Sequence, residues 1–430
     1  MSKKRIVLIW VLILTVASAG VLIGRWSIVG AEGEGYEDLK IFTEALSMVK
    51  KNYVEDVKTK DLVYGAIKGM LSSLDPHSSF LSPEAYKEMQ AETKGEFGGI
   101  GIQIGIKEGM LTVIAPIEDT PAYRAGLKAG DKIIKINNEL TKDMSLHDAV
   151  DKMRGAPKTS VIITILREGW KETKDFTLVR EIIKVKSVKS KLLEDGIGYV
   201  KINQFQEQTA ADLSTALEKL TQEKMNSLIL DLRNNPGGLL NSAVGVTSQF
   251  LPPGKLVVYI KGKKGEKTDY NTTEDKPDYN IPMIVLVNEG SASASEIVAG
   301  ALKDWNRAVI LGTKTFGKGS VQSVIPLSDG SGLRLTTAIY YTPKGTSIQA
   351  TGIAPDIIVK LETKEQGKEH PVIREKDLER HLKNNEGEGV PKEPEEMAPI
   401  EIEEKEDAQL QRAVDLLKTW KVFKELPKAS

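Results

Sequence analysis

The chain has 430 residues, which predicts two or three domains, and its 40% of apolar residues can form a sizeable core. The formal net charge of −1 provides no basic surface, so we expect no nucleic-acid partner. The absence of cysteine excludes disulfides, thiolate metal sites and a cysteine nucleophile.

The first 30 residues carry an export or anchoring signal. Lys3, Lys4 and Arg5 precede residues 6–24, which are uncharged and mostly apolar and are long enough to span a bilayer. We assign residues 1–30 to a signal or transmembrane anchor that binds the membrane. Cleavage near Ala17-Ser18-Ala19 is the alternative, and it would release a secreted protein. Either outcome places most of the chain outside the cytoplasm.

Residues 31–94 are predicted to form an N-terminal helical region. Leu39, Phe42, Leu46 and Val49 recur at helical spacing after a short linker rich in glycine and acidic residues. Such helices could join two copies of the chain, so a homo-oligomer is a possible state.

The hydrophobic period changes at residue 95, where β-strands are predicted to replace helices. Residues 95–183 resemble a PDZ domain through two elements, the Gly99-Ile100-Gly101-Ile102 loop and the Ala125-Gly126-Leu127 sequence followed by Gly130-Asp131. This resemblance implies that Gly99, Ile100 and Gly101 bind the carboxylate of a peptide C-terminus, and that the Ile102 strand pairs with the peptide.

Strands and helices alternate over residues 184–375, which favours an α/β core. Residues 376–430 are predicted to be an acidic linker and a C-terminal helix. The expected fold class is therefore multi-domain α/β. It combines the N-terminal helical region, an inserted β-rich PDZ domain and a core with its reactive serine at a strand-turn-helix junction.

Ser293 lies in the run Gly290-Ser291-Ala292-Ser293-Ala294-Ser295-Glu296, between an apolar strand and a helix. A serine on such a turn is exposed beside backbone N–H groups and the positive end of the helix dipole. The alternative is that these serines only cap the helix, which serine does well.

Lys318 follows 25 positions later, between Gly317 and Gly319 (318 − 293 = 25). None of the four histidines lies near either segment in the sequence, and a desolvated lysine can replace histidine as the base of a serine hydrolase. An exposed hairpin lysine is the alternative. A nucleotide-binding P-loop is excluded because Gly319 stands where that motif needs Ser or Thr.

Asn235-Pro236-Gly237-Gly238 ends another apolar strand. Its two glycines could expose N–H groups for an oxyanion hole, or they could form an ordinary turn. The sequence has no HExxH motif or histidine cluster, so we expect neither a metal nor a cofactor.

These segments together resemble the C-terminal processing peptidases, which are serine-lysine proteases of the tail-specific type. The resemblance also includes Asp75-Pro76-His77-Ser78 and Gly352-Ile353-Ala354-Pro355-Asp356. It implies that Ser293 is the nucleophile, Lys318 the general base and Gln322 the residue that orients the lysine. It further implies an oxyanion hole formed by Gly237 or Gly238 and the amide of Ala294.

The sequence thus predicts a serine endopeptidase that cleaves exported proteins, unfolded or with an exposed C-terminal tail, after its PDZ domain has bound that tail. The alternative is a membrane-tethered PDZ binding protein whose protease fold is inactive. The presence of Ser293, Lys318 and both glycines favours the enzyme.

Overall fold

The computed structural model describes residues 33–107, 109–142, 144–273, 279–360, 373–383 and 407–425. The chain divides into two compact units, Met1–Ser73 and Leu74–Ser430. The predicted signal or anchor at residues 1–30 and most of the acidic linker lie outside the described residues. Among the residues that are described, no helix is long and apolar enough to cross a bilayer.

The described part of the first unit consists of two helices, α2 (Gly33–Asn52) and α3 (Thr59–Ser72). Their presence confirms the predicted helical character of this region. The apolar side chains of α2 are largely exposed; Leu39 is 65% and Phe42 43% accessible.

The second unit begins with a short strand, β1 (Ser79–Leu81), followed by α4 (Pro83–Lys94). The strand falls within residues 31–94, which were predicted to form a helical region. Its residues pair with β18 (Gly332–Tyr341), more than 250 positions away along the chain. This distant partner explains the difference, because strand pairing can override local helical preference.

An antiparallel sheet forms the PDZ domain, with strand order β3-β4-β5-β7-β8 and β6 beside β5. Ile133, Ile136 and Ile163 are fully buried in its core. Two short helices complete it, α5 (Pro121–Arg124) and α6 (Leu146–Met153). Its strands are β3 (Ile102–Lys107), β4 (Met110–Pro116), β5 (Lys132–Ile136), β6 (Glu139–Leu140), β7 (Ser160–Leu166) and β8 (Lys174–Val179). A separate antiparallel pair, β2 (Glu96–Gly99) and β9 (Glu181–Lys184), connects this domain to the rest of the chain.

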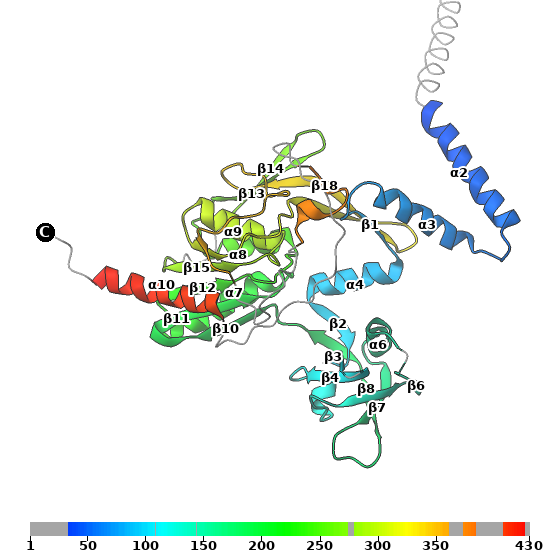
Figure 1. Cartoon of the computed structure of the whole chain (residues 1–430), viewed down its shortest axis with the longest axis horizontal. Coiled ribbons are helices and arrows are strands. Elements are labelled where there is room, and N and C mark those ends of the chain that lie inside the picture. Colours follow the sequence, from blue (N-terminus) through cyan, green and yellow to red (C-terminus); the bar gives the residue numbers. More distant parts are fainter. Residues whose placement is uncertain are drawn as a thin grey trace, which may run out of the picture. The chain divides into compact units, whose positions relative to one another are not determined.

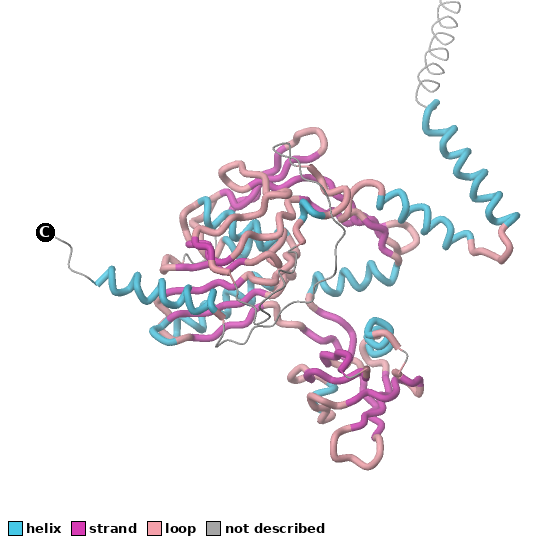
Figure 2. The backbone as a smooth tube through the Cα atoms, viewed as in Figure 1, coloured by secondary structure: helices cyan, strands magenta, loops and turns pink. Residues whose placement is uncertain are grey.

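The α/β core is built on a six-stranded sheet of order β10-β11-β12-β15-β16-β19, parallel except for β10 (Figures 1 and 2). Every residue of its central strands β12 and β15 is buried, as expected for strands covered on both faces. The strands are β10 (Val188–Leu192), β11 (Ile197–Ile202), β12 (Ser227–Asp231), β15 (Met283–Val287), β16 (Val309–Gly312) and β19 (Ile357–Ile358).

Helices cover both faces of this sheet. Leu228, Leu230 and Val285 share a core with α7 (Thr209–Gln222), α8 (Leu240–Thr247) and α9 (Ala294–Asp304). The alternate residues Ile229 and Ile284 pack instead with α10 (Ala408–Glu425). This alternation follows from the period of two along each strand.

A second sheet supplies the strand that follows Lys318. It has the order β1-β18-β13-β14, with β17 paired to β18. Its remaining strands are β13 (Leu256–Gly262), β14 (Lys267–Asn271) and β17 (Ser320–Pro326). Tyr340 of β18 is buried in the same core as α9, so this sheet lies against the helix that starts at the serine run.

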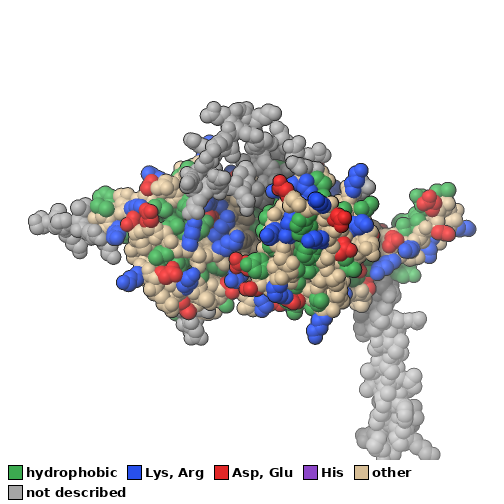
Figure 3. Space-filling model, turned by 90° about the horizontal axis from the view of Figure 1, so that it is seen from below, with side chains coloured by type: hydrophobic (Ala, Val, Ile, Leu, Met, Phe, Trp, Pro, Cys, Tyr) green, Lys and Arg blue, Asp and Glu red, His purple; other side chains and the backbone are tan. Residues whose placement is uncertain are grey.

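On the surface, lysine and arginine side chains lie among acidic and apolar ones (Figure 3).

Candidate active site

Three loops that carry the predicted site residues follow three adjacent parallel strands, β12, β15 and β16. The carboxyl ends of parallel strands meet at one edge of a sheet, where open α/β folds place their sites. The glycine pair follows β12, the serine run follows β15, and Lys318 follows β16. The fold therefore brings segments distant in sequence to one edge of the sheet.

Ser293 occupies the N-cap position of α9 with an unusual backbone conformation, φ 53° and ψ −113°. A non-glycine residue in such a conformation costs roughly 1–3 kcal/mol and persists only where its surroundings hold it. Ser293 is 9% exposed, whereas Ser291 and Ser295 are fully buried. Among the three serines, it alone retains access to solvent.

The other two serines hold the loop in place. The Ser291 hydroxyl donates to the carbonyl oxygen of Leu232 at 2.8 Å, and the Ser295 hydroxyl donates to that of Asn235 at 2.9 Å. Both acceptors belong to the segment that precedes the glycine pair. These hydrogen bonds join the serine loop to the glycine loop and leave neither hydroxyl available as a nucleophile.

Gly237 packs directly against Ser293. Its φ is 101°, and a Cβ at this position would lie 2.8 Å from Ser293 Cβ and 2.9 Å from Ala294 N. Gly238 also has a positive φ, and a Cβ there would meet the Phe205 carbonyl oxygen at 2.2 Å. Both positions require glycine because the backbone approaches its neighbours too closely for any side chain.

The predicted oxyanion donors differ in their availability. The Gly237 N–H donates to Asn235 Oδ1 at 2.9 Å, so it is already engaged. The Gly238 N–H and the first helical amide, that of Ala294, form no hydrogen bond within the part of the chain that the structure describes. These two amides are therefore the better candidates for binding a developing negative charge.

Lys318 is partly buried, just before β17. Burial lowers the pKa of its amine, and the positive charge of Arg334 acts in the same direction. Glu375, Asp75 and Glu296 oppose this effect. Within the described residues no hydrogen bond joins Lys318 Nζ to Ser293 Oγ, and catalytic hydrogen bonds often tighten only when substrate binds.

Gln322 lies on β17, but its side chain is engaged elsewhere. Its Nε2 donates to Thr336 Oγ1 at 2.9 Å and to Ser320 Oγ at 3.2 Å. The hydroxyl of Thr336 in turn donates to Asp75 Oδ1 at 3.1 Å. Gln322 thus belongs to a hydrogen-bonded chain that reaches Asp75, whose charge acts on Lys318, and its orienting role stays a prediction.

Glu296 is a site residue that sequence reasoning did not assign, although it ends the serine motif. Its fully buried carboxylate accepts hydrogen bonds from the N–H groups of Ser293 and Lys318, both at Oε2 and both 2.9 Å long. Oε1 accepts from Gly317 N at 2.8 Å and from Thr315 Oγ1. One carboxylate thus binds the backbone of both the serine and the lysine.

Replacing this carboxylate with an amide should misalign the two segments. In Glu296→Gln, one acceptor oxygen becomes an NH2 group that faces N–H donors. We expect kcat/KM to fall by about 10²-fold, since small displacements of reacting groups have effects of this size. Steady-state kinetics with a peptide substrate, together with the melting temperature, measure this effect.

The loss should also depend on pH. Burial raises the pKa of Glu296 to about 7 from its ordinary value of 4.5. Below about pH 7 the wild-type carboxyl takes up a proton, so the difference in kcat/KM between the wild type and Glu296→Gln should become smaller. Glu289→Gln is the matched control, because Glu289 accepts from Thr313 at 2.8 Å but bonds to neither the serine nor the lysine. An equal loss in both variants would contradict the bridging role of Glu296.

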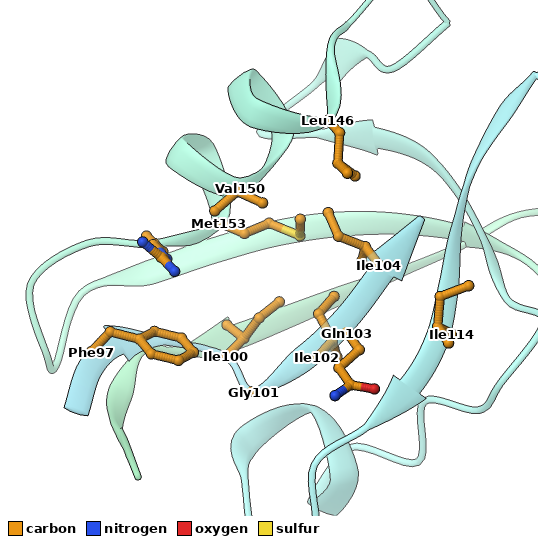
Figure 4. Close-up of a pocket in the computed structure, with 11 residues that line it drawn as sticks. Phe97, Ile100, Gly101, Ile102, Gln103, Ile104, Ile114, Leu146, Val150 and Met153 are labelled. Atoms are coloured by element: carbon orange, nitrogen blue, oxygen red, sulfur yellow. The ribbon is translucent and has the colours of Figure 1, made fainter. Parts of the chain in front are cut away.

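The PDZ domain contains a separate groove of about 420 Å³ between β3 and α6. Figure 4 shows Leu146, Val150 and Met153 of α6 opposite Ile104 of β3. Because β3 is the edge strand of its sheet, its free side can pair with an added peptide strand.

Three of the four predicted peptide-binding residues line this groove, namely Ile100, Gly101 and Ile102. Gly101 has a φ of 77°, and a Cβ on it would lie 2.3 Å from Thr120 Cβ. Gly99 instead lies in β2, where it pairs with Glu181, and it does not line the groove.

Family models match three parts of the chain. "Peptidase family S41" matches residues 196–359, which contain Ser293 and Lys318. "PDZ domain" matches residues 112–167, and "Activating protease CtpB N-terminal domain" matches residues 27–85.

Two relatives match most of the chain. The carboxy-terminal-processing protease of Bartonella bacilliformis is 44% identical over 400 residues, which cover 90% of each protein. The carboxyl-terminal-processing protease of Synechocystis sp. is 37% identical over 347 residues, which cover 79% of this chain and 80% of the relative. Among solved structures, the photosystem II D1 C-terminal processing protease is 32% identical, with 74% of this chain and 92% of its own covered, at a TM-score of 0.45.

Proposed function

Because the chain belongs to the carboxy-terminal processing proteases of peptidase family S41, and is thus a serine-type peptidase, we propose that Ser293 is its nucleophile and Lys318 its general base. The observation that most supports this proposal is the shared carboxylate of Glu296. It binds the backbone of both residues, which lie 25 positions apart in the sequence.

In the proposed reaction, the neutral amine of Lys318 takes the proton of the Ser293 hydroxyl as Oγ attacks the scissile carbonyl carbon. Burial lowers the pKa of the Lys318 amine and so raises the fraction of the neutral base. The Gly238 and Ala294 amides would bind the oxyanion. Collapse of this intermediate breaks the C–N bond, and the leaving amine takes the proton from Lys318.

The product of this first half-reaction is an ester between Ser293 and the N-terminal part of the substrate. Lys318, now neutral again, removes a proton from water as the water attacks the ester carbonyl. The returning proton restores the Ser293 hydroxyl and releases the acid product. The proposed cycle needs no metal or cofactor.

We propose that substrates are exported proteins, unfolded or with an exposed C-terminal tail, that bind through a free and apolar C-terminus. The groove beside β3 has apolar walls, and the Gly101 loop stands at its end (Figure 4). The peptide would add a strand to β3 while loop amides hold its carboxylate. Delivery of the bound chain to Ser293 would follow.

A pair of peptides tests this substrate choice. The same apolar-ended peptide, made with a free carboxylate and with a C-terminal amide, should differ in kcat/KM by about tenfold or more, since a lost charge-assisted hydrogen bond weakens binding by ~1.5–3 kcal/mol. Steady-state cleavage by the purified protein measures this ratio. Equal kcat/KM values would mean that the carboxylate is not recognised.

Leu146→Lys is a suitable companion variant. Leu146 lines the groove and is 39% exposed, so a lysine there should weaken the binding of apolar peptides without unfolding the domain. An inactive binding module, the alternative function, would bind the free-acid peptide and cleave neither peptide.

The proposed location is extracytoplasmic, with residues 1–30 as a membrane anchor or as a cleaved signal. The basic residues and the apolar run of the sequence support this assignment. A homo-oligomer is proposed through α2, on which Leu39 and Phe42 are exposed apolar residues.

A further inference from the structure

The partly buried His77 and the buried Glu375 form a pair beside the Lys318 segment. Glu375 is fully buried, and its two carboxylate oxygens lie 2.9 and 2.7 Å from His77 Nε2. Gln349 Nε2 also donates to Glu375 Oε1, at 2.9 Å. The pair joins residues 298 positions apart, from a turn before β1 and from the short 3-10 helix η2 (Glu375–Asp377).

Hydrogen bonds link Glu375 to the backbone both before and after Lys318. The Glu375 N–H donates to the carbonyl oxygen of Phe316 at 3.2 Å. On the other side, the Gly319 N–H donates to Gln349 Oε1 at 2.9 Å, and Gln349 holds Glu375. The segment 316–319 is therefore attached to Glu375 both before and after the lysine.

A fully buried carboxylate is unfavourable unless a positive charge or several hydrogen bonds compensate it. Neither Gln349 nor a neutral imidazole brings a permanent positive charge. Among the charged groups that shift the pKa of Lys318, Glu375 has the largest effect, ahead of Arg334, Asp75 and Glu296. The ammonium form of Lys318 is thus a charge partner for Glu375, in addition to the imidazole of His77 that contacts both carboxylate oxygens.

We propose that Glu375 is a positioning residue for Lys318, and that its carboxylate is the charge partner of the lysine when Lys318 carries the proton taken from Ser293. This inference rests on the proposed role of Lys318 as the base. The proton reaches Lys318 during attack, and a fixed negative charge then stabilises the ammonium that forms. His77 and Gln349 hold the carboxylate in position.

Removing the charge while keeping the shape should alter the pH profile. In Glu375→Gln, the side-chain oxygen still accepts from Gln349, and the amide NH2 can donate to His77 in its other tautomer. Loss of a negative charge favours the neutral amine of Lys318. The acidic limb of kcat/KM should therefore move to lower pH, by about one unit or more, since a nearby opposite charge shifts a pKa by ~1–3 units.

Asp377→Asn is the matched control. Asp377 lies on the same 3-10 helix and accepts from the Arg374 N–H at 2.9 Å, and its charge is not among those that act on Lys318. The acidic limb of the kcat/KM profile of Asp377→Asn should coincide with that of the wild type. Coincident limbs in wild type, Asp377→Asn and Glu375→Gln would mean that Glu375 is only structural, which would overturn the inference.

His77→Gln provides a second, independent variant if Glu375→Gln does not fold. It keeps the carboxylate and removes the imidazole, so the acidic limb should stay or move to higher pH, and turnover should continue. A limb that moves to lower pH, or a complete loss of activity, would contradict the proposed arrangement. The Lys318→Ala variant distinguishes failure of the proposed dyad from failure of this inference. If Lys318→Ala is active, the proposed dyad fails. If Lys318→Ala is inactive and the acidic limb of Glu375→Gln does not move, only the role of Glu375 is rejected.

Discussion

Ser293→Ala is expected to abolish cleavage, with a fall in kcat of at least about 10⁴-fold, the scale seen when a catalytic nucleophile is removed. Ser293 is the serine of its motif with an accessible side chain, and its backbone is held at φ 53° beside two amides without partners in the described chain. Steady-state turnover of an unfolded protein substrate measures the loss. The variant should fold normally, because alanine replaces serine without adding atoms.

The neighbouring serines are the controls for this prediction. Ser291→Ala and Ser295→Ala each remove a buried hydrogen bond to the glycine loop, to Leu232 and Asn235 respectively. We expect each to reduce stability by ~1–3 kcal/mol, the cost of leaving a buried acceptor unsatisfied, and to retain more activity than Ser293→Ala. Full activity in Ser293→Ala would end its assignment as the nucleophile.

The α/β class and the regular elements of the core could be predicted because their signals are local. The apolar strand before Ser293 and the helix after it are both present, as β15 and α9. Runs of apolar residues and a following helix-forming segment depend on neighbours within about ten positions, where sequence patterns are most reliable.

Contacts between distant residues could not be predicted in this way. Nothing local to Asp75-Pro76-His77 indicates that His77 meets Glu375, because the two are 298 positions apart and the second follows a polar stretch without periodicity. The sequence places no histidine near Lys318, whereas the fold brings His77 to the carboxylate beside it. Charge partners of this kind depend on chain topology rather than on pattern.

Glu296 illustrates a signal that was present but not interpreted. A glutamate three positions after an N-cap serine is the pattern of a capping box, and its carboxylate does accept from the Ser293 N–H. That pattern predicts only a local contact. The additional hydrogen bonds to Gly317 and Lys318 arise because β16 lies beside β15, which places the lysine segment over the start of α9.

Lys318→Ala should be as damaging as Ser293→Ala, because a nucleophile and its base act as a unit and their losses do not add. Lys318→Arg should fail equally, although it preserves the positive charge, since arginine does not lose its proton in proteins. The double variant Ser293→Ala/Lys318→Ala should be no less active than either single variant. Turnover in Lys318→Arg would show that another group is the base.

The pH dependence of the wild-type enzyme provides the complementary test. The base acts when neutral, so kcat/KM should rise with pH through the pKa of Lys318, which burial places below its ordinary value of 10.5. The free energy of unfolding should also increase with pH over this range. Between the lowered pKa and 10.5 the unfolded chain binds more protons than the folded one, so unfolding becomes less favourable as pH rises. Lys318→Met removes this titration, so its stability should lack that part of the pH slope and its activity should be lost at every pH. If the same slope persisted in Lys318→Met, the titrating group would not be Lys318.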